Sequence, residues 1–310
     1  MEKSPLISLK TKRKIQRNLP LFFLALPALA YVICFNYLPM FGVVLAFKDY
    51  SYRDGILGSD WVGFKYFEYF FKSNDAAVVL RNSLLYHLVI FATKTVVCVI
   101  VALLLYRIEN KKCLKLYQST IILPNFISWV LVAYIAFLLL SNTQGIFNQL
   151  LTSWGMPAID WYSEPKYWPF ILVIFNLWKV VGMDCIIYYA TLCGIDPSLF
   201  EAAEMDGASR FKQTIHIALP ALVPVVCIMS IMAMGSLMST DFGLFFQVPK
   251  NSGALYSATD VISTYTFRGL KAGNMSQTAA VGLFQSVVGT IMTLVTNGII
   301  RKVSPDNAMF

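Results

Sequence analysis

Long apolar stretches constrain this chain of 310 residues more than any other feature. A helix needs roughly 20 apolar residues to cross a hydrocarbon core of ~30 Å, and a window of that length finds six candidate spans. They are approximately Leu21–Ala46, Val79–Tyr106, Tyr117–Leu140, Trp168–Thr191, Ile215–Thr240 and Gln277–Ile300. The composition, 57% hydrophobic and only 14% charged, agrees with this pattern. We therefore predict an all-α polytopic membrane protein with six transmembrane helices.

The basic residues predict the orientation of these helices. Loops on the cytoplasmic side of a membrane protein carry an excess of lysine and arginine. With six spans, one side receives Lys3, Lys10, Lys12, Arg13, Lys14, Arg17, Arg107, Lys111, Lys112, Lys115, Arg210, Lys212, Arg301 and Lys302, and the longer opposite loops hold fewer. Both termini are therefore expected in the cytoplasm. The net charge of +8 implies no nucleic-acid partner, because anionic membrane lipids account for the basic clusters.

This arrangement divides the chain into three parts. Residues 1–18 form a basic cytoplasmic tail, residues 19–303 form the membrane domain, and residues 304–310 form a short cytoplasmic tail. The basic tail is a candidate for a short helix on the membrane surface. No second domain is expected.

A polar segment at Glu201–Pro220, here called the polar insert, separates two of the apolar spans. Asp196 is expected to cap a helix, with Glu201 and Glu204 near the positive N-terminal end of that helix. Gly207 permits a sharp turn. A second short helix is then expected to run to the end of the insert, where a proline can kink or start the next span. The sequence thus predicts a compact helix-turn-helix outside the bilayer.

The spacing within the polar insert resembles the EAA loop of permease subunits in binding-protein-dependent ABC importers. The residues that carry the resemblance are Glu201, Ala202, Ala203, Asp206, Gly207, Ile217, Leu219 and Pro220. The resemblance implies that these same residues couple the chain to the ATPase. In that family the loop is a cytoplasmic coupling helix that docks on an ATPase subunit. The resemblance implies the type I ABC importer permease architecture in a bacterial plasma membrane, with a coupling loop at about residues 192–220.

Shorter motifs resemble the carbohydrate, or maltose-type, group of these importers. The string from Trp61 to Phe67 is similar to an element that follows the first helix, with Tyr66 where asparagine is usual, and Gln144–Asn148 is similar to a G-x-x-N element. The stretch from Asp260 to Val288 resembles the polysaccharide-permease branch. These likenesses imply import of oligosaccharides or polysaccharide fragments that an extracellular solute-binding protein delivers. A permease for a non-sugar solute is the alternative within the family.

The resemblance also implies partners that supply the energy. The chain has no G-x-x-x-x-G-K-[ST] phosphate loop, so we do not expect it to hydrolyse ATP. Two cytoplasmic ATPase subunits are expected to bind ATP and Mg²⁺, and a second permease subunit is expected beside this one, usually as a heterodimer, although a homodimer stays open. No cofactor, catalytic residue or metal-ligand spacing is expected in this chain. A sugar-processing enzyme is poorly supported, because Asp160 and Glu164 alone are a weak signal for paired catalytic carboxylates.

Polar residues inside the spans are candidates for the substrate pathway, because such groups usually face a bundle interior or a water-filled path. The candidates are Asn125, Trp129, Asn176, Trp178, Lys179 and Gln285. The tryptophans are able to stack on sugar rings, but core packing is their more common role. Gln285 belongs to a polar, small-residue stripe with Gly282, Ser286 and Gly289. Either a pore lining or close helix packing explains that stripe.

Two lysines, Lys94 and Lys179, fall inside the spans, where an unpaired charge is costly. Each is expected to pair with a carboxylate or to line an aqueous cavity, and Asp184 is the sequence-local partner for Lys179. A counter-charge for an acidic sugar and a structural ion pair are both open interpretations. An ion-coupled secondary transporter would use the same residues as titrating groups, but it leaves the polar insert unexplained.

Overall fold

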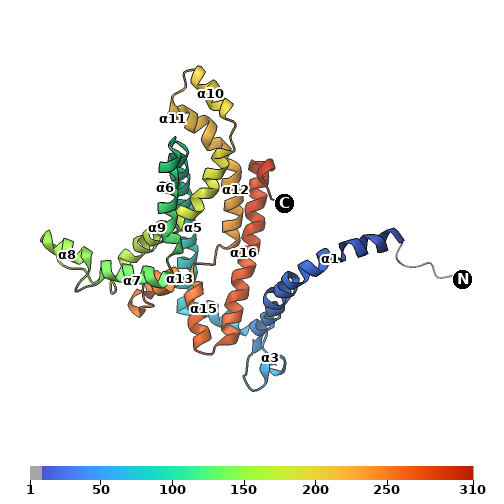
Figure 1. Ribbon diagram of the computed structural model, residues 1–310. Coiled ribbons are helices and arrows are strands. Elements are labelled where there is room, and N and C mark those ends of the chain that lie inside the picture. The colour runs from blue at the N-terminus through green and yellow to red at the C-terminus, as the bar shows by residue number, and fades with distance from the viewer. Residues whose placement is uncertain (1–8, 310) are drawn as a thin grey trace.

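The computed structural model describes residues 9–309, together with the side-chain surroundings of residues 18–302 and 304–309. Its regular structure is almost entirely helical (Figure 1). The helices are α1 (Leu9–Val32), α2 (Leu38–Met40), α3 (Gly55–Gly58), α4 (Lys65–Lys72), α5 (Asn74–Tyr106), α6 (Lys111–Ile122), α7 (Trp129–Leu140), α8 (Ile146–Ser153), α9 (Trp168–Cys193), α10 (Pro197–Met205), α11 (Arg210–Gln213), α12 (Leu219–Gly235), α13 (Phe242–Gln247), α14 (Tyr256–Thr259), α15 (Ile262–Lys271) and α16 (Met275–Val303). Two short strands, β1 (Lys48–Asp49) and β2 (Asp60–Trp61), pair antiparallel.

Short π and 3-10 segments connect or extend these helices. They are η1 (Ile33–Tyr37), η2 (Phe41–Phe47), η3 (Leu123–Phe126), η4 (Pro165–Tyr167), η5 (Thr214–Ala218), η6 (Gly253–Leu255) and η7 (Pro305–Asn307).

Within residues 9–309, five helical stretches are long and apolar enough to cross a membrane, or six if one bent pair of helices counts as a span. The predicted all-α fold with up to six spans is confirmed.

Four long helices form the centre of the bundle. α5 packs along α9, and α12 packs against both α9 and α16. A buried apolar cluster around Trp168, Leu172 and Phe245 fills one end of this bundle. A second cluster, around Cys185, Leu192 and Leu222, fills the end nearer the polar insert. The helices that enclose the candidate site are therefore fixed at both ends.

The third expected span is not one straight helix, which corrects the prediction for Tyr117–Leu140. α6 and η3 end near Phe126, and α7 begins at Trp129 after a bend of 94°. Pro124 lies at this break, and its ring removes a backbone donor and disfavours a continuous helix. The Ser128 side chain then caps α7 by accepting the Leu131 N–H at 3.3 Å. Hydropathy detected the apolar content of this region but not its bend.

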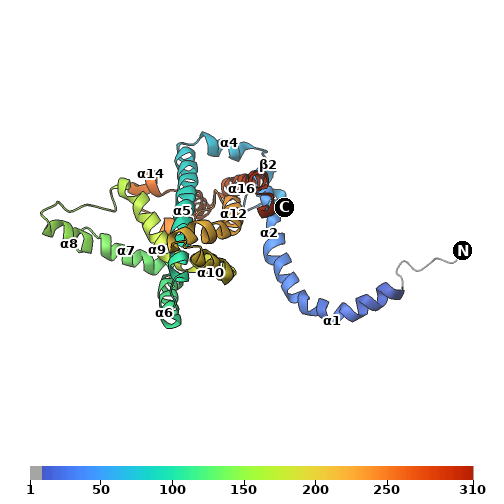
Figure 2. The same ribbon diagram turned by 90° about the horizontal axis from the view of Figure 1, so that it is seen from above.

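The N-terminal helix α1 contains part of the expected basic tail as well as part of the first expected span. α1 begins at Leu9, so residues 9–18 of the expected basic tail are helical and continuous with the first span; residues 1–8 lie outside the described chain. None of the apolar stretch of this span is buried. Figures 1 and 2 show α1 leaving the bundle on the side opposite α7 and α8. Lipid or another chain must therefore cover its apolar side chains.

Candidate functional site

The polar insert begins within α10, whose start is fixed by local capping. Asp196 accepts the Ser198 N–H at 3.0 Å, and this hydrogen bond holds the pKa of Asp196 below its usual value. The predicted cap is confirmed. The expected position of Glu201 and Glu204 near the N-terminal end is wrong, because α10 starts at Pro197 and has no acidic residue in its first turn. Glu204 lies in the last turn instead.

Gly207 turns the chain after α10. Its φ is +74°, a left-handed conformation that favours glycine. A Cβ at this position would meet nothing within 4 Å, so the requirement for glycine is conformational rather than steric. Ser209 then caps α11 by accepting the Lys212 N–H at 3.4 Å. The predicted turn is confirmed.

The second helix of the polar insert is continuous with the fifth span. α11 passes through η5 into α12, so Arg210–Gly235 forms one helix. Pro220 lies in the first turn of α12, and the carbonyl that its ring would crowd belongs to His216 within the π segment η5. The wider π turn accommodates the proline without a break. The sequence predicted a kink or a new start at Pro220, whereas the structure has an uninterrupted helix.

The polar insert stands beyond one end of the bundle (Figure 1). Among the residues predicted for ATPase coupling, the exposed ones are Glu201, Ala202, Asp206, Gly207, Leu219 and Pro220, and the half-buried ones are Ala203 and Ile217. Three apolar side chains that the sequence reading did not single out are also exposed: Met205 at 88%, Phe211 at 71% and Leu199 at 53%. Exposed apolar side chains on a polar segment favour contact with another protein. Contact of any of these residues with a partner stays a prediction.

The end of α5 anchors the polar insert to the bundle. The Arg107 guanidinium donates to the Arg210 carbonyl at 2.6 Å and also to the Thr214 hydroxyl. Glu109 lies 3.7 Å from the Arg210 guanidinium, in an exposed ion pair. Movement of the insert is thereby linked to α5 as well as to α12.

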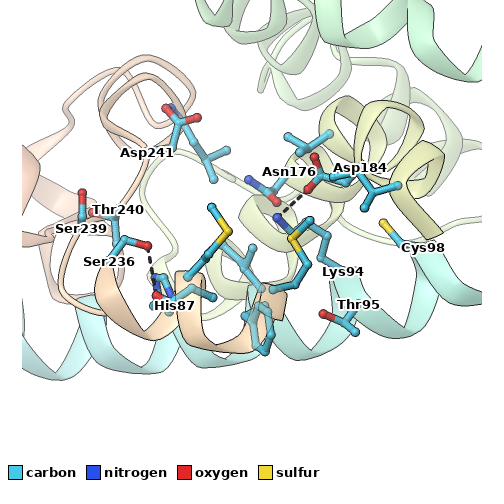
Figure 3. A pocket seen from close by; sticks show the side chains of 18 of the residues that line it. His87, Lys94, Thr95, Cys98, Asn176, Asp184, Ser236, Ser239, Thr240 and Asp241 are labelled. Carbon is cyan, nitrogen blue, oxygen red and sulfur yellow. Dashed lines mark hydrogen bonds and ion pairs between the residues drawn. The ribbon is translucent and has the colours of Figure 1, made fainter. Parts of the chain in front are cut away.

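A second candidate site is a cavity of about 460 Å³ between α5, α9, α12 and the segment after α12, here called the polar cavity. Figure 3 shows its polar side chains converging from these elements. They are His87, Lys94, Thr95, Asn176, Asp184, Ser236, Ser239, Thr240 and Asp241. The fifth span was expected to continue to Thr240, but α12 ends at Gly235. The residues that follow therefore leave the helix and close one side of the cavity.

An ion pair crosses one wall of the polar cavity. The Lys94 ammonium lies 2.6 Å from a carboxylate oxygen of Asp184, and the two side chains are 29% and 32% exposed. The expected pairing of Asp184 with Lys179 is wrong. Positions 179 and 184 are five residues apart on α9, and a helix advances ~100° per residue, so the two side chains point to different faces.

Lys179 instead occupies the break in the third span. Its ammonium donates to the backbone carbonyls of Asn125 at 2.8 Å and Ile127 at 2.6 Å, and it lies 5.3 Å from the Trp129 ring centre. The Lys179 residue is 8% exposed. Carbonyls left without helical partners at a helix end need donors, and this buried lysine supplies them.

Trp129 reaches the edge of the polar cavity indirectly. Its indole N–H donates to the Asp241 carboxylate at 2.8 Å. The other carboxylate oxygen of Asp241 accepts the N–H groups of Gly243 at 2.8 Å and Leu244 at 3.3 Å, at the start of α13. Both oxygens of this cavity residue are therefore held in place.

The structure separates the predicted pathway residues. Asn176 lines the polar cavity, is 7% exposed, and its side-chain oxygen has no hydrogen-bond partner within the described residues. Trp178 is 43% exposed, and Gln285 is half-buried on α16 away from the cavity lining. Contact of any of them with substrate stays a prediction. The sequence did not predict His87 or the run Ser236–Asp241 as lining residues. The polar composition of that run was the available signal.

Comparison with known proteins places this geometry among transport proteins. Residues 96–305 match the family described as "Binding-protein-dependent transport system inner membrane component". The chain is 33% identical to the polygalacturonan/rhamnogalacturonan transport system permease protein YteP of Bacillus subtilis, over 91% of this chain and 88% of that protein. It is 35% identical to protein LplB of the same organism, over 93% of this chain and 90% of that one.

Solved structures agree over nearly the whole length. One is a bacterial ABC transporter involved in the import of the acidic polysaccharide alginate, with a TM-score of 0.87 and 28% identity, covering 95% of this chain and 99% of that chain. Another is the bacterial alginate ABC transporter in complex with an alginate pentasaccharide-bound periplasmic protein, with a TM-score of 0.85 and 29% identity, covering 94% and 97%.

Proposed function

The chain belongs to the family of binding-protein-dependent transport system inner membrane components, and on this premise we propose that it is the sugar-translocating permease subunit of an ATP-driven importer. Its role is transport and not chemical catalysis. The observation that carries the mechanism is one continuous helix, Arg210–Gly235, which joins the exposed polar insert to the polar cavity. Met229, Met232 and Ala233 of this helix line the cavity. Movement of the insert is therefore transmitted directly to the cavity wall.

The cargo is an oligosaccharide or a polysaccharide fragment. The names of the relatives support this class, since one is a permease for polygalacturonan and rhamnogalacturonan and a solved neighbour imports alginate. The polar cavity supplies suitable chemistry. Among the described residues, the side-chain oxygen of Asn176 and Nε2 of His87 have no hydrogen-bond partner. Together with nearby serine and threonine hydroxyls, they suit hydrogen bonding to sugar hydroxyls.

The importer requires further subunits. We infer that a second permease subunit, in a heterodimer, covers the exposed α1, because none of the apolar stretch of that span is buried in this chain. Two cytoplasmic ATPase subunits bind ATP and Mg²⁺, and one of them docks on the polar insert of this chain, where Met205 and Phe211 stay exposed. An extracellular solute-binding protein delivers the sugar, in keeping with the periplasmic protein in the alginate complex.

Both termini and the polar insert lie on the cytoplasmic side of the bacterial plasma membrane in this proposal. The C-terminal end of α16 and the polar insert lie at the same end of the bundle in Figure 1. Arg301 and Lys302 are in the last turn of α16, and positive charge near the end of a membrane span favours the cytoplasmic side.

Labelling of a single cysteine introduced at Ser209 is expected only after the membrane is made permeable. Labelling of intact cells from outside would overturn this orientation.

The coupling role is tested with Glu201→Lys and Gly207→Pro in the assembled transporter. Both variants are expected to insert normally, yet to separate ATP hydrolysis from sugar uptake, because they change the exposed carboxylate and the turn of the polar insert. Glu164→Lys, an equal charge change on an exposed loop at the other end of the bundle, serves as the control. Normal coupled uptake in both test variants would contradict the docking role.

Transport energetics and cargo are tested separately. Uptake in vesicles is expected to continue when ion gradients are collapsed and ATP is present, which excludes an ion-coupled carrier. Competition between an oligosaccharide and an amino acid for that uptake then tests the cargo class. Loss of uptake when the ion gradients are collapsed would reject the ATP-driven mechanism. Inhibition of uptake by the amino acid alone would reject the sugar cargo.

A further inference from the structure

A hollow separate from the polar cavity opens between α5 and α9, in the halves of these helices that lie away from the polar insert. Its volume is about 780 Å³, and we call it the α5–α9 groove. Its walls are mostly apolar, with Leu85 and Val89 from α5 and Phe170, Val173 and Ile174 from α9. Several of these are exposed, Phe170 at 72%, Ile174 at 63% and Leu85 at 52%. The described part of the chain leaves this apolar groove without a covering element.

Positive charge gathers at one end of the groove. Arg81 and Lys166 both line it, one from α5 and one from the segment before α9. Lys166 lies 3.4 Å from Glu164, with its side chain 64% exposed. Arg81 makes no ion pair with any described residue. The end of the groove therefore carries an excess of positive charge.

Arg81 is held in position rather than free to move. Its guanidinium donates to the Asn82 side-chain oxygen at 3.0 Å and 3.2 Å and to the Ser257 carbonyl at 2.9 Å. Asn82 is 5% exposed, and its amide in turn donates to the Asp260 carbonyl at 3.0 Å. Hydrogen bonds to the buried Asn82 and to the exposed Ser257 carbonyl thus fix the charge at this end of the groove. Fixed arginines suit phosphate, because the planar guanidinium presents several donors at once.

The length of the groove matches one leaflet of a bilayer. Arg81 and Thr93 mark its ends along α5 and are 12 positions apart, which corresponds to ~18 Å at about 1.5 Å per residue. Half of a hydrocarbon core of ~30 Å is ~15 Å. The charged end therefore lies at the depth of lipid head groups, and the apolar wall lies at the depth of acyl chains.

We propose that the α5–α9 groove binds an anionic phospholipid of the leaflet opposite the polar insert. The phosphate lies against Arg81 and Lys166, and an acyl chain lies along Leu85, Val89 and Phe170. A site that is basic at one end and apolar along its length has the shape and charge of such a lipid. The lipid stabilises the packing of α5 against α9 and so the walls of the polar cavity, which α5 and α9 share.

The test uses the assembled transporter in nanodiscs of phosphatidylcholine with one tenth phosphatidylglycerol. Native mass spectrometry measures the phosphatidylglycerol that stays bound after detergent challenge. Arg81→Gln combined with Lys166→Gln is expected to reduce this retention by roughly 30-fold, since each basic group near a lipid surface contributes about 1 kcal/mol. Arg53→Gln combined with Lys72→Gln is the matched control, because these basic residues are exposed but lie outside the groove.

Two further measurements test which molecule occupies the α5–α9 groove. Val89→Trp, which fills the groove without a charge change, is expected to reduce retention as well. A photo-crosslinker at Ile174 is expected to label lipid. Equal retention by the test and control pairs would overturn the proposal, and so would crosslinking of Ile174 to a helix of a partner subunit in place of lipid.

Discussion

The Lys94 ammonium and the Asp184 carboxylate lie 2.6 Å apart and join α5 to α9 along one wall of the polar cavity. Both side chains are less than a third exposed, so each charge depends on the other inside the membrane region. The positive charge of Lys94 is therefore balanced within the chain. An acidic sugar would have to compete with Asp184 for it.

The first prediction concerns this ion pair. Lys94→Met and Asp184→Asn are each expected to lower the stability of the purified protein by about 1 to 3 kcal/mol, because each leaves one partly buried charge unpaired. The double variant is expected to recover part of this loss. Thermal unfolding in detergent measures all three variants. A double variant whose loss equals the sum of the single losses would show that the two groups do not interact.

The second prediction concerns Lys179. Lys179→Met leaves the carbonyls of Asn125 and Ile127 without their donor, and an unmet buried polar group costs about 1 to 3 kcal/mol. Thermal unfolding is expected at lower temperature, whereas Trp178→Phe at the exposed neighbouring position changes little. Unchanged stability of Lys179→Met with loss of sugar uptake would instead assign this lysine to the substrate.

The third prediction separates two glycines of the last span. A Cβ at Gly289 would lie 2.3 Å from the Gly235 carbonyl oxygen of α12, whereas a Cβ at Gly282 would meet nothing within 4 Å. Gly289→Ala is therefore expected to destabilise the α12–α16 contact by about 1 to 3 kcal/mol, and Gly282→Ala is the tolerated control. Thermal unfolding and detergent resistance report the difference. Equal tolerance at both positions would argue against close packing at Gly289.

The fourth prediction is a pH dependence outside the membrane spans. The Tyr66 hydroxyl donates to the Asp49 carboxylate at 2.5 Å, and burial followed by this hydrogen bond raises the pKa of Tyr66 to about 12. Because the folded pKa is raised above the usual value of 10.0, the stability from neutral Tyr66 is complete below about pH 10 and is lost as the pH rises through about 12. The pKa of Tyr66 is measured as the pH midpoint of the difference in tyrosinate absorbance between the wild type and Tyr66→Phe. A difference midpoint near pH 10 would refute it.

Local chemistry explains which expectations about the polar insert succeeded. The Asp196 cap and the turn at Gly207 depend on a few neighbouring residues and on one backbone angle. The start of α10 after the Asp196 cap was predicted correctly, but neither Glu201 nor Glu204 lies in the first turn of this nine-residue helix, and Glu204 lies in its last turn. The family resemblance drawn from this segment is confirmed by the match over residues 96–305.

The bend in the third span shows where local pattern becomes insufficient. Hydropathy averages over ~20 residues, so a run that is apolar on both sides of Pro124 is read as one span. The bend of 94° is sustained by a contact from another helix, since Lys179 of α9 satisfies the carbonyls at the break. Pro124 and Ser128 mark the break within Tyr117–Leu140, but the donor that satisfies its carbonyls comes from a helix distant in sequence.

The sequence by itself determined the helical membrane fold, the positions of most spans, the capped and turned polar insert, and the family, because hydropathy, capping and backbone freedom are properties of neighbouring residues. Only the tertiary structure decided that Asp184 pairs with Lys94 rather than Lys179, and that Asn176 reaches the polar cavity while Gln285 does not. These outcomes depend on how each helix is rotated and packed against helices distant in sequence. Side-chain partners across a bundle are set by that packing and not by spacing along the chain.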